Sequence, residues 1–311
     1  MIIGDIFIET IGSALGSINV SNIEQAARYG KDEDFVRNRV GPLLLPHRAE
    51  GETACSLALE AAANALDASR IEAEDLELVV FVTQNPDHGG LPHNSAILHG
   101  RLGLAKSVAC FDVGLGCSGY VYGLAITASL MKTGSMKSAM LVTSDHYTPF
   151  LKPDDQNTKL LFGDGAAATI LSRQGAFEIR AAAMGTDGGN HDKLIRREDG
   201  IEMNGRAIFN FSRQTVPESI ITFCNANDLA LDSFDALLLH QGSRAVVEEI
   251  AKHLNVNSNI IPVEIGDTGN TVSSSIPLLL EKRMTDRAIR RLLLTGFGVG
   301  LSWGNVWLER G

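Results

Sequence analysis

The chain has 311 residues, which is enough for about two domains and for a core that needs no disulfide or metal to hold it together. A hydrophobic content of 44% with 21% charged residues is typical of a globular protein and excludes a disordered chain. The net charge of −10 argues against nucleic acid, and against an anionic membrane surface, as a main partner.

The termini and the cysteines indicate a compartment. None of the four cysteines belongs to a CxxC pair, so we expect no zinc site, and we expect neither another metal nor a cofactor. Their wide spacing is typical of a reducing cytoplasm, where we place the protein. Residues 1–15 are apolar but lack a basic region, so they predict a first strand and not a signal peptide. No apolar run reaches about 18 residues, and we expect no transmembrane helix.

Short apolar runs alternate with helical stretches along the chain. We expect helices at 53–68 and 118–132. The expected strands are Leu76–Thr83, Ala139–Ser144, Ala166–Leu171, Ala236–His240 and Leu292–Thr295. Because strands and helices alternate, we predict parallel pairing and an α/β class. Because the strands are apolar almost throughout, we predict a sheet that is covered on both faces.

The chain also contains two similar halves, which we bound at 1–172 and 173–311. In each half a buried strand is followed by a glycine-containing turn, a helix and a second strand. The interval from Cys117 to Leu141 is 24 residues, and that from Asn270 to Leu293 is 23. Such a duplication would place the two turns near a symmetry axis, where ligands usually bind. The alternative is a chance likeness of two strand–helix–strand units.

Cys117 is the first candidate functional residue. It follows a short apolar strand and a glycine-flanked turn in the stretch FDVGLGCSGY, and it precedes an amphipathic helix. The glycines permit the sharp turn that presents a side chain at a strand–helix junction. A thiol at a helix N-terminus feels the positive end of the dipole, which lowers its pKa as a nucleophile requires. The alternative is a small core residue, and we interpret the other three cysteines in that way.

Two residues of the second half complete a candidate catalytic group. His240 ends an apolar strand and runs into a glycine turn, a position suited to acid–base work. Its alternative role is that of a hydrogen-bonded residue at a strand end. Asn270 lies in the stretch GDTGNT and could donate a hydrogen bond to a developing oxyanion, although asparagine after glycine is often only a turn residue.

Two glycine-rich loops remain. The segment Gly296–Gly300 follows the last apolar strand, but it lacks dinucleotide-loop spacing and lies too near the C-terminus for a nucleotide site. We interpret it as a loop whose backbone N–H groups could stabilise an oxyanion. The segment Phe162–Ala166 precedes a strand, and we assign it a structural role.

Taken together, these motifs resemble the β-ketoacyl-acyl carrier protein synthase III family over essentially the whole chain. The motifs that carry the resemblance are FDVGLGCSGY, LLFGDGAAATIL, LLLHQGS, GDTGNTVSSSIP and GFGVGLSWG, in that order. The resemblance implies a thiolase fold of five α-β-α-β-α layers built from two duplicated halves. It also implies a homodimer and a role in fatty acid, lipid or secondary-metabolite biosynthesis.

The resemblance further implies a reaction. Cys117 would take an acyl group from a coenzyme A or carrier-protein thioester, and a malonyl thioester would lose CO₂ and attack the acyl-enzyme. His240 and Asn270 would stabilise the thioester oxyanion during decarboxylation. The backbone N–H groups of Cys117 and Val299 would form the oxyanion hole.

The sequence departs from the family at the positions that match its binding residues. Phe35 stands where the family commonly has a tryptophan that stacks on adenine, and Arg39 matches an arginine that contacts phosphates. Gln156 replaces a second arginine. Arg244 lies one place before the arginine that docks the carrier protein, and Leu91 matches a phenylalanine at the acyl pocket. These changes favour a specialised member of the family over the housekeeping one.

Other functions remain as alternatives. An acyltransferase that forms esters or amides would use His240 as a general base for its acceptor. A silent partner in a heterodimer would not acylate Cys117. Within the enzymes, a thiolase lacks this histidine motif, and an enzyme like hydroxymethylglutaryl-coenzyme A synthase needs a carboxylate base that we do not find in the sequence.

Overall fold

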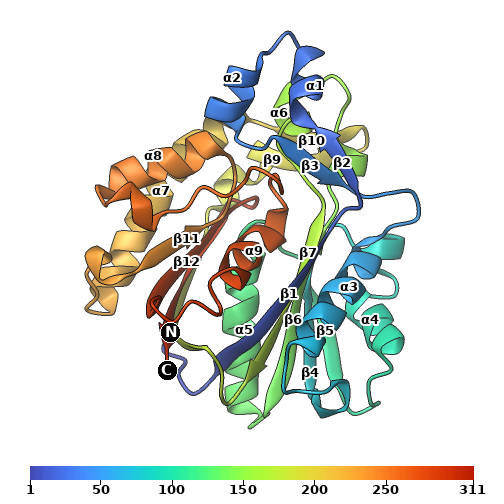
Figure 1. The fold of residues 1–311 in the computed structure, drawn as a ribbon, viewed down its shortest axis with the longest axis vertical. Helices are drawn as coiled ribbons and strands as arrows, with labels where there is room; N and C mark the ends of the chain where they lie inside the picture. The colour runs from blue at the N-terminus through green and yellow to red at the C-terminus, as the bar shows by residue number, and fades with distance from the viewer.

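The computed structural model describes residues 1–311 and is built around one mixed sheet of nine strands (Figure 1). In spatial order the strands are β11 (Ala236–Leu239), β12 (Arg291–Gly298), β13 (Ser302–Arg310), β8 (Phe177–Thr186), β1 (Phe7–Leu15), β7 (Gly165–Ser172), β6 (Ser138–Asp145), β4 (Leu78–Val82) and β5 (Ala109–Val113). The longer helices are α3 (Ala54–Asp67), α4 (Asn94–Leu102), α5 (Gly119–Thr133), α7 (Gly205–Ala226), α8 (Arg244–Leu254) and α9 (Ser275–Glu281).

The strand pairing has the same pattern on the two sides of the β1–β8 junction. On one side β4 and β6 are parallel, and β6–β7 and β7–β1 are antiparallel. On the other side β11 and β12 are parallel, and β12–β13 and β13–β8 are antiparallel. The prediction of parallel pairing is therefore right only for the strands that a helix separates along the chain. Antiparallel pairing occurs in the β12–β13 hairpin, where the strands follow each other directly, but also in β1–β7 and β13–β8, although helices separate those strands along the chain.

Helices cover and separate the two parts of the sheet, giving five layers (Figure 1). Helices α3 and α4 form one outer layer, α7 and α8 form the other, and α5 and α9 lie between the two parts of the sheet. Strand β4 shows why its sequence is apolar throughout. Leu78, Val80 and Val82 face the core around α5, whereas Val79 and Phe81 face the core under α3.

The expected elements agree closely with the observed ones. The helices expected at 53–68 and 118–132 are α3 and α5, and the five expected strands are β4, β6, β7, β11 and β12. Thr53 and Ser56 begin α3 with reciprocal side-chain and backbone hydrogen bonds. No helix of the structure is both long and apolar enough to cross a membrane.

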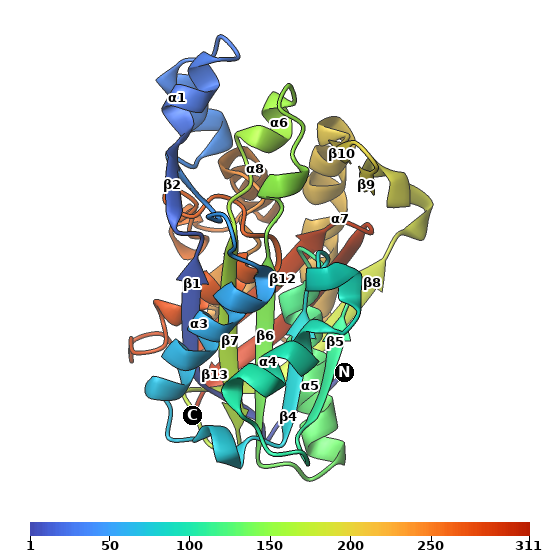
Figure 2. The ribbon, with the colours of Figure 1, turned by 90° about the vertical axis from the view of Figure 1, so that its right-hand side faces the viewer.

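Smaller elements lie beyond one end of the sheet (Figure 2). They are the strand pairs β2 (Ile18–Ser21)–β3 (Leu44–His47) and β9 (Leu194–Arg197)–β10 (Gly200–Met203), the helices α1 (Asn22–Ala27), α2 (Glu33–Phe35) and α6 (Gln156–Lys159), and a π turn, η1 (Val36–Val40). They contribute residues to the cavity described below.

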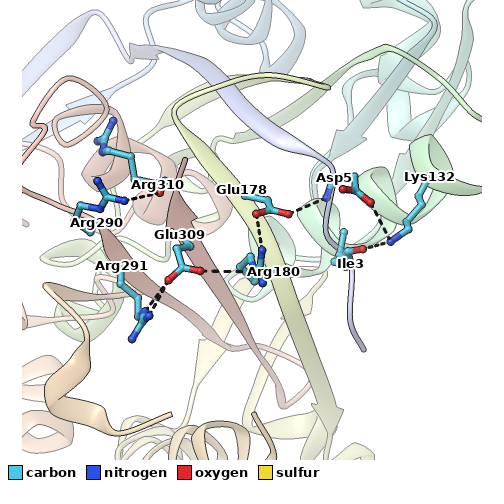
Figure 3. Close-up of polar contacts among 9 residues, drawn as sticks. All are labelled: Ile3, Asp5, Lys132, Glu178, Arg180, Arg290, Arg291, Glu309 and Arg310. Atoms are coloured by element: carbon cyan, nitrogen blue, oxygen red, sulfur yellow. Dashed lines mark hydrogen bonds and ion pairs between the residues drawn. The ribbon is translucent and has the colours of Figure 1, made fainter. Parts of the chain in front are cut away.

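Polar contacts join the two parts of the sheet near the end where both chain termini lie (Figures 1 and 3). Glu178 on β8 accepts a hydrogen bond from the backbone N–H of Asp5 at 2.9 Å and pairs with Arg180 at 2.7 Å. Glu309 on β13 pairs with Arg291 on β12 at 2.7 Å. Each of these partly exposed ion pairs contributes about 1 kcal/mol or less. Of these contacts, the Asp5–Glu178 hydrogen bond crosses the junction, at which β1 and β8 share only two residue pairs.

Candidate active site

Cys117 lies in the turn between β5 and α5, as its glycine-flanked sequence predicts. The residue is 4% exposed, and α5 begins two residues later. The backbone of Gly298 passes directly over it. A Cβ atom on Gly298 would lie 2.7 Å from the Cβ of Cys117 and 2.9 Å from its sulfur, and φ is +152°. Only glycine fits there, so the loop after β12 packs against the sulfur itself.

The pKa of Cys117 differs from the sequence prediction. Burial raises the pKa of the thiol to about 12, and nearby Asp145 adds to this effect. Hydrogen bonds from the backbone N–H groups of Val299 and Cys117 act in the opposite direction but do not outweigh burial. The expectation of a lowered pKa is therefore wrong for this structure. The sulfur is protonated at neutral pH, and its proton must leave when the thiol is acylated.

His240 follows β11 and is held from two sides. It is 2% exposed, its Nδ1 atom lies 2.7 Å from the hydroxyl oxygen of Ser275, and its ring makes an edge contact with Phe297 at 5.4 Å. Burial lowers the pKa of His240 to about 3, while a hydrogen bond to the backbone of Val272 acts in the opposite direction. The imidazole is therefore neutral at pH 7 and can donate a hydrogen bond without carrying a charge.

Asn270 is fixed so that its amide nitrogen is free. The side-chain oxygen accepts a hydrogen bond from the backbone N–H of Val272 at 2.9 Å, and Nδ2 has no partner in the chain. The backbone is anchored too, because Asn270 donates to the carbonyl of Leu161 at 2.9 Å and accepts from the N–H of Gly163 at 3.1 Å. The loop 162–166 thus has the structural role that its sequence predicts.

Val272 links the two donors through its backbone. Its N–H bonds Asn270, and its backbone also hydrogen bonds to His240. Val272 has φ of 53°, which is a strained conformation for a β-branched residue. Such strain is found mostly where function constrains the backbone.

One cavity of about 240 Å³ brings the three candidates together. Cys117 comes from the first half of the chain, and His240 and Asn270 come from the second. Phe297 and Gly298 line the same space. A nucleophile and two neutral hydrogen-bond donors facing one buried cavity can carry out acyl transfer and stabilise an oxyanion.

The structure separates the expected binding residues into two groups. Phe35, Arg39 and Gln156 line the cavity, and Arg39 has no hydrogen bond or ion pair within the chain. Arg244 and Leu91 do not line it. Arg244 pairs with Glu248 at 3.2 Å, and Leu91 is 86% exposed on the outside of the molecule.

The sequence analysis missed Asp145, which is buried near Cys117 without lining the cavity. It is fully buried, accepts hydrogen bonds from the Ser273 hydroxyl, from the backbone N–H of Gln84 (2.9 Å) and from Thr83 (3.3 Å), and so ties the loop after β4 and the turn before α9 to the end of β6. Burial raises the pKa of Asp145 to about 7, although the hydrogen bonds act in the opposite direction. The sequence contained one signal that could have identified Asp145. A carboxylate at the end of a buried strand seldom serves packing alone.

Comparisons with known proteins agree with this geometry. Residues 111–188 match the family described as 3-Oxoacyl-[acyl-carrier-protein (ACP)] synthase III, and residues 224–310 match its C-terminal domain. The β-ketoacyl-[acyl-carrier-protein] synthase III of Acidiphilium cryptum is 31% identical over 317 residues, covering 97% of this chain and 98% of that protein. The protein of the same name from Clostridium botulinum is 30% identical, covering 88% and 89% of the two chains.

The structural likeness is equally extensive. The crystal structure of 3-oxoacyl-(acyl carrier protein) synthase III from Pseudomonas aeruginosa PAO1 superimposes with a TM-score of 0.90 and 30% identity, covering 98% of each chain. The resemblance of the five sequence motifs and the predicted thiolase fold are thereby confirmed. The chain belongs to the 3-oxoacyl-[acyl-carrier-protein] synthase III family, whose members are condensing acyltransferases.

Proposed function

We propose that this enzyme condenses an acyl group carried on Cys117 with a malonyl thioester. In the first step the sulfur of Cys117 forms a bond to the acyl carbonyl carbon, and the donor thiol leaves with a proton. The backbone N–H of Val299, which points to the sulfur, and that of Cys117 are placed to stabilise the tetrahedral oxyanion.

In the second step the malonyl thioester loses CO₂. The electron pair of the broken carbon–carbon bond stays on the α carbon, and negative charge develops on the thioester oxygen. Asn270, through its free Nδ2, and neutral His240 would donate hydrogen bonds to that oxygen. The carbanion then attacks the carbonyl carbon of the acyl-enzyme, the carbon–sulfur bond breaks, and the Cys117 sulfur leaves as a thiolate that takes up a proton from solvent.

One observation favours this reaction over the alternative functions. Cys117, His240 and Asn270 line the same buried cavity, the two donors are neutral, and their partners Ser275 and Val272 do not line it. Simple transfer of an acyl group to an oxygen or nitrogen acceptor gives no role to the free amide of Asn270. Carbon–carbon condensation uses it directly.

The entrance supports a specialised role within the family. Arg39 offers one guanidinium for a phosphate, but the neutral amide of Gln156 lines the cavity where the family resemblance leads us to expect a second one. Arg244, on α8, pairs with Glu248, whose carboxylate would compete with an acidic carrier for the guanidinium. We infer a primer or a donor other than acetyl-coenzyme A.

We also propose a homodimer. Strand β5 pairs only with β4 and ends the sheet, so its outer edge carries unpaired backbone groups. Its residues Phe111–Val113 are only half buried in one chain, and Leu91 is 86% exposed. A second copy pairing at this edge would cover both features.

Intact-protein mass spectrometry tests the reaction. The enzyme is incubated with acyl thioesters of coenzyme A and of carrier protein, alongside Cys117→Ala and, as a matched control, Cys224→Ala, whose thiol lies under α7 away from the cavity. We expect an adduct in the wild type and the control but not in Cys117→Ala, and CO₂ release when malonyl thioester is added. Ester or amide products without CO₂ would instead identify an acyltransferase, and no adduct from any donor would indicate a silent partner.

A further inference from the structure

A second cavity lies beside the first, among residues that neighbour Cys117. Its volume is about 120 Å³, half that of the first, and the two cavities share Leu194. Val299, whose N–H points to the sulfur, lines the second cavity. So does Gln84, whose carboxamide lies so close to Gly116 that any side chain there would collide with it. Two residues that line the second cavity therefore lie close to the nucleophile: Val299, next to the sulfur, and Gln84, next to Gly116.

This small cavity carries hydrogen-bonding groups as well as an apolar wall. The hydroxyl of Tyr147 donates to Oε1 of Gln84 at 2.6 Å, and Nε2 of Gln84 has no partner in the chain. Tyr147 is buried, and burial beside Asp145 and Cys117 raises its pKa well above the usual value, so the phenol stays protonated. The tyrosine therefore fixes the amide with its oxygen satisfied and its two N–H donors available.

Arg196 adds a second donor at the rim of this cavity. Its guanidinium lies 3.6 Å from the centre of the Phe150 ring, and it makes no ion pair with a carboxylate of the chain. The cavity lining therefore includes the N–H groups of Gln84 and Arg196 together with the apolar residues Leu194 and Ile201.

We propose that this cavity holds the acyl group on Cys117 and selects acyl chains that bear a hydrogen-bond-accepting oxygen, such as a hydroxyl, an oxo or a carboxylate oxygen. The inference rests on the proposed acylation of Cys117 and names its substrate class. The small volume of the cavity limits the acyl group to a short chain. Because Gln84 lies against Gly116, the residue before Cys117, it would be close to the carbonyl end of the bound acyl group.

The physical reason is the cost of leaving a donor without a partner. A plain alkyl chain would displace water from Nε2 of Gln84 and replace it with nothing, whereas an oxygen on the chain restores the hydrogen bond. A site that offers such donors discriminates strongly against analogues that lack the matching group.

Four donors of equal chain length test the inference, because they differ only in their oxygens: butyryl-, 3-hydroxybutyryl-, acetoacetyl- and succinyl-coenzyme A. The rate of Cys117 adduct formation is measured by mass spectrometry, with each donor at a concentration well below its KM so that the rates compare kcat/KM. We expect at least one oxygen-bearing donor to exceed butyryl by tenfold or more. Gln84→Leu and Tyr147→Phe should each reduce this ratio. The control Glu198→Gln, an exposed change in the turn between β9 and β10, should not reduce it.

The same four acyl donors also show whether the cavity prefers a charged carboxylate oxygen or a neutral hydroxyl or oxo oxygen. A preference for succinyl that Arg196→Gln removes would identify a carboxylate, and a preference for hydroxybutyryl or acetoacetyl that depends on Gln84 would identify a neutral oxygen. Butyryl as the fastest wild-type donor would overturn this inference alone, even if the variants fail to fold. No adduct from any acyl donor would overturn the proposed acylation, and this inference with it.

Discussion

The Nδ1 atom of His240 lies 2.7 Å from the hydroxyl oxygen of Ser275 at the start of α9. That hydroxyl also accepts from the backbone N–H of Gln241 at 3.3 Å, so its own proton is available to donate to Nδ1. This arrangement favours the neutral tautomer that carries its proton on Nε2. Ser275 is therefore a positioning residue for the donor that we assign to the decarboxylation step.

Ser275→Ala should slow decarboxylation of the malonyl thioester about fivefold, since the ring loses about 1 kcal/mol of orienting interaction. Acylation of Cys117 should change much less. CO₂ release and adduct formation, measured separately, check the two steps. Ser219→Ala on α7 serves as the control, because its hydroxyl bonds Val216 and lies outside the cavity. An equal loss in both steps would show that Ser275 acts only through folding.

Asn270→Ala should reduce decarboxylation by about a hundredfold or more, the usual effect of removing an oxyanion donor. Acylation should fall only slightly, because the backbone N–H groups of Cys117 and Val299 remain in place. Single-turnover acylation and CO₂ release distinguish these effects. If both fall together, Asn270 is a structural turn residue and not a donor to the thioester oxygen.

The pKa of His240 predicts a pH dependence of stability. The folded pKa is about 3 and the ordinary value is 6.5, so between these values the unfolded state binds a proton that the folded state does not. The contribution of His240 to stability is therefore complete above pH 6.5 and is lost as the pH falls toward 3. Relative to His240→Asn, the wild type should lose about 2 kcal/mol between about pH 6.5 and 4.5.

Urea unfolding at several pH values checks this loss, because every other titrating group is common to the wild type and the variant. A difference in the free energy of unfolding that stays constant with pH would mean that His240 is protonated in the folded protein.

Asp145→Ala should lower the free energy of unfolding by about 3 kcal/mol or more, because the buried donors of Ser273, Gln84 and Thr83 lose their acceptor. Asp145→Asn should cost less, since one oxygen remains to accept hydrogen bonds. Urea unfolding measures both variants. Equal stability of wild type and Asp145→Ala would contradict the assignment of Asp145 as the residue that ties the loop after β4 and the turn before α9 to β6.

Leu91→Asp should weaken the proposed dimer, because it places a charge where an exposed apolar side chain would be covered by the second copy. We expect the dissociation constant to rise at least tenfold, measured by sedimentation equilibrium against a monomer of 33.3 kDa. Ile221→Asp is the matched control, since Ile221 is 42% exposed on α7, in the outer layer opposite α3 and α4. A wild type that is monomeric at all concentrations would refute the dimer itself.

Some residues of the site could be predicted from the sequence and others could not. Cys117, His240 and Asn270 could be found because each follows a buried strand or a glycine turn, and local patterns of this kind identify the end of an element. Ser275 and Asp145 were missed. Their importance comes from a partner far away in the chain, 35 residues from Ser275 to His240 and 128 from Asp145 to Ser273, and no local pattern encodes such a pairing.

The sequence by itself determined the elements, the duplicated motifs, the family and the candidate catalytic residues, because these depend on periodicity and on side-chain chemistry that can be identified position by position. Only the tertiary structure decided the sign of the Cys117 pKa shift. The local dipole of α5 predicts a lowered pKa, but burial under Gly298 and the loops of the second half raises it to about 12. Desolvation depends on what covers a group from every side, and part of that cover comes from Gly298, which is 181 positions from Cys117 along the chain.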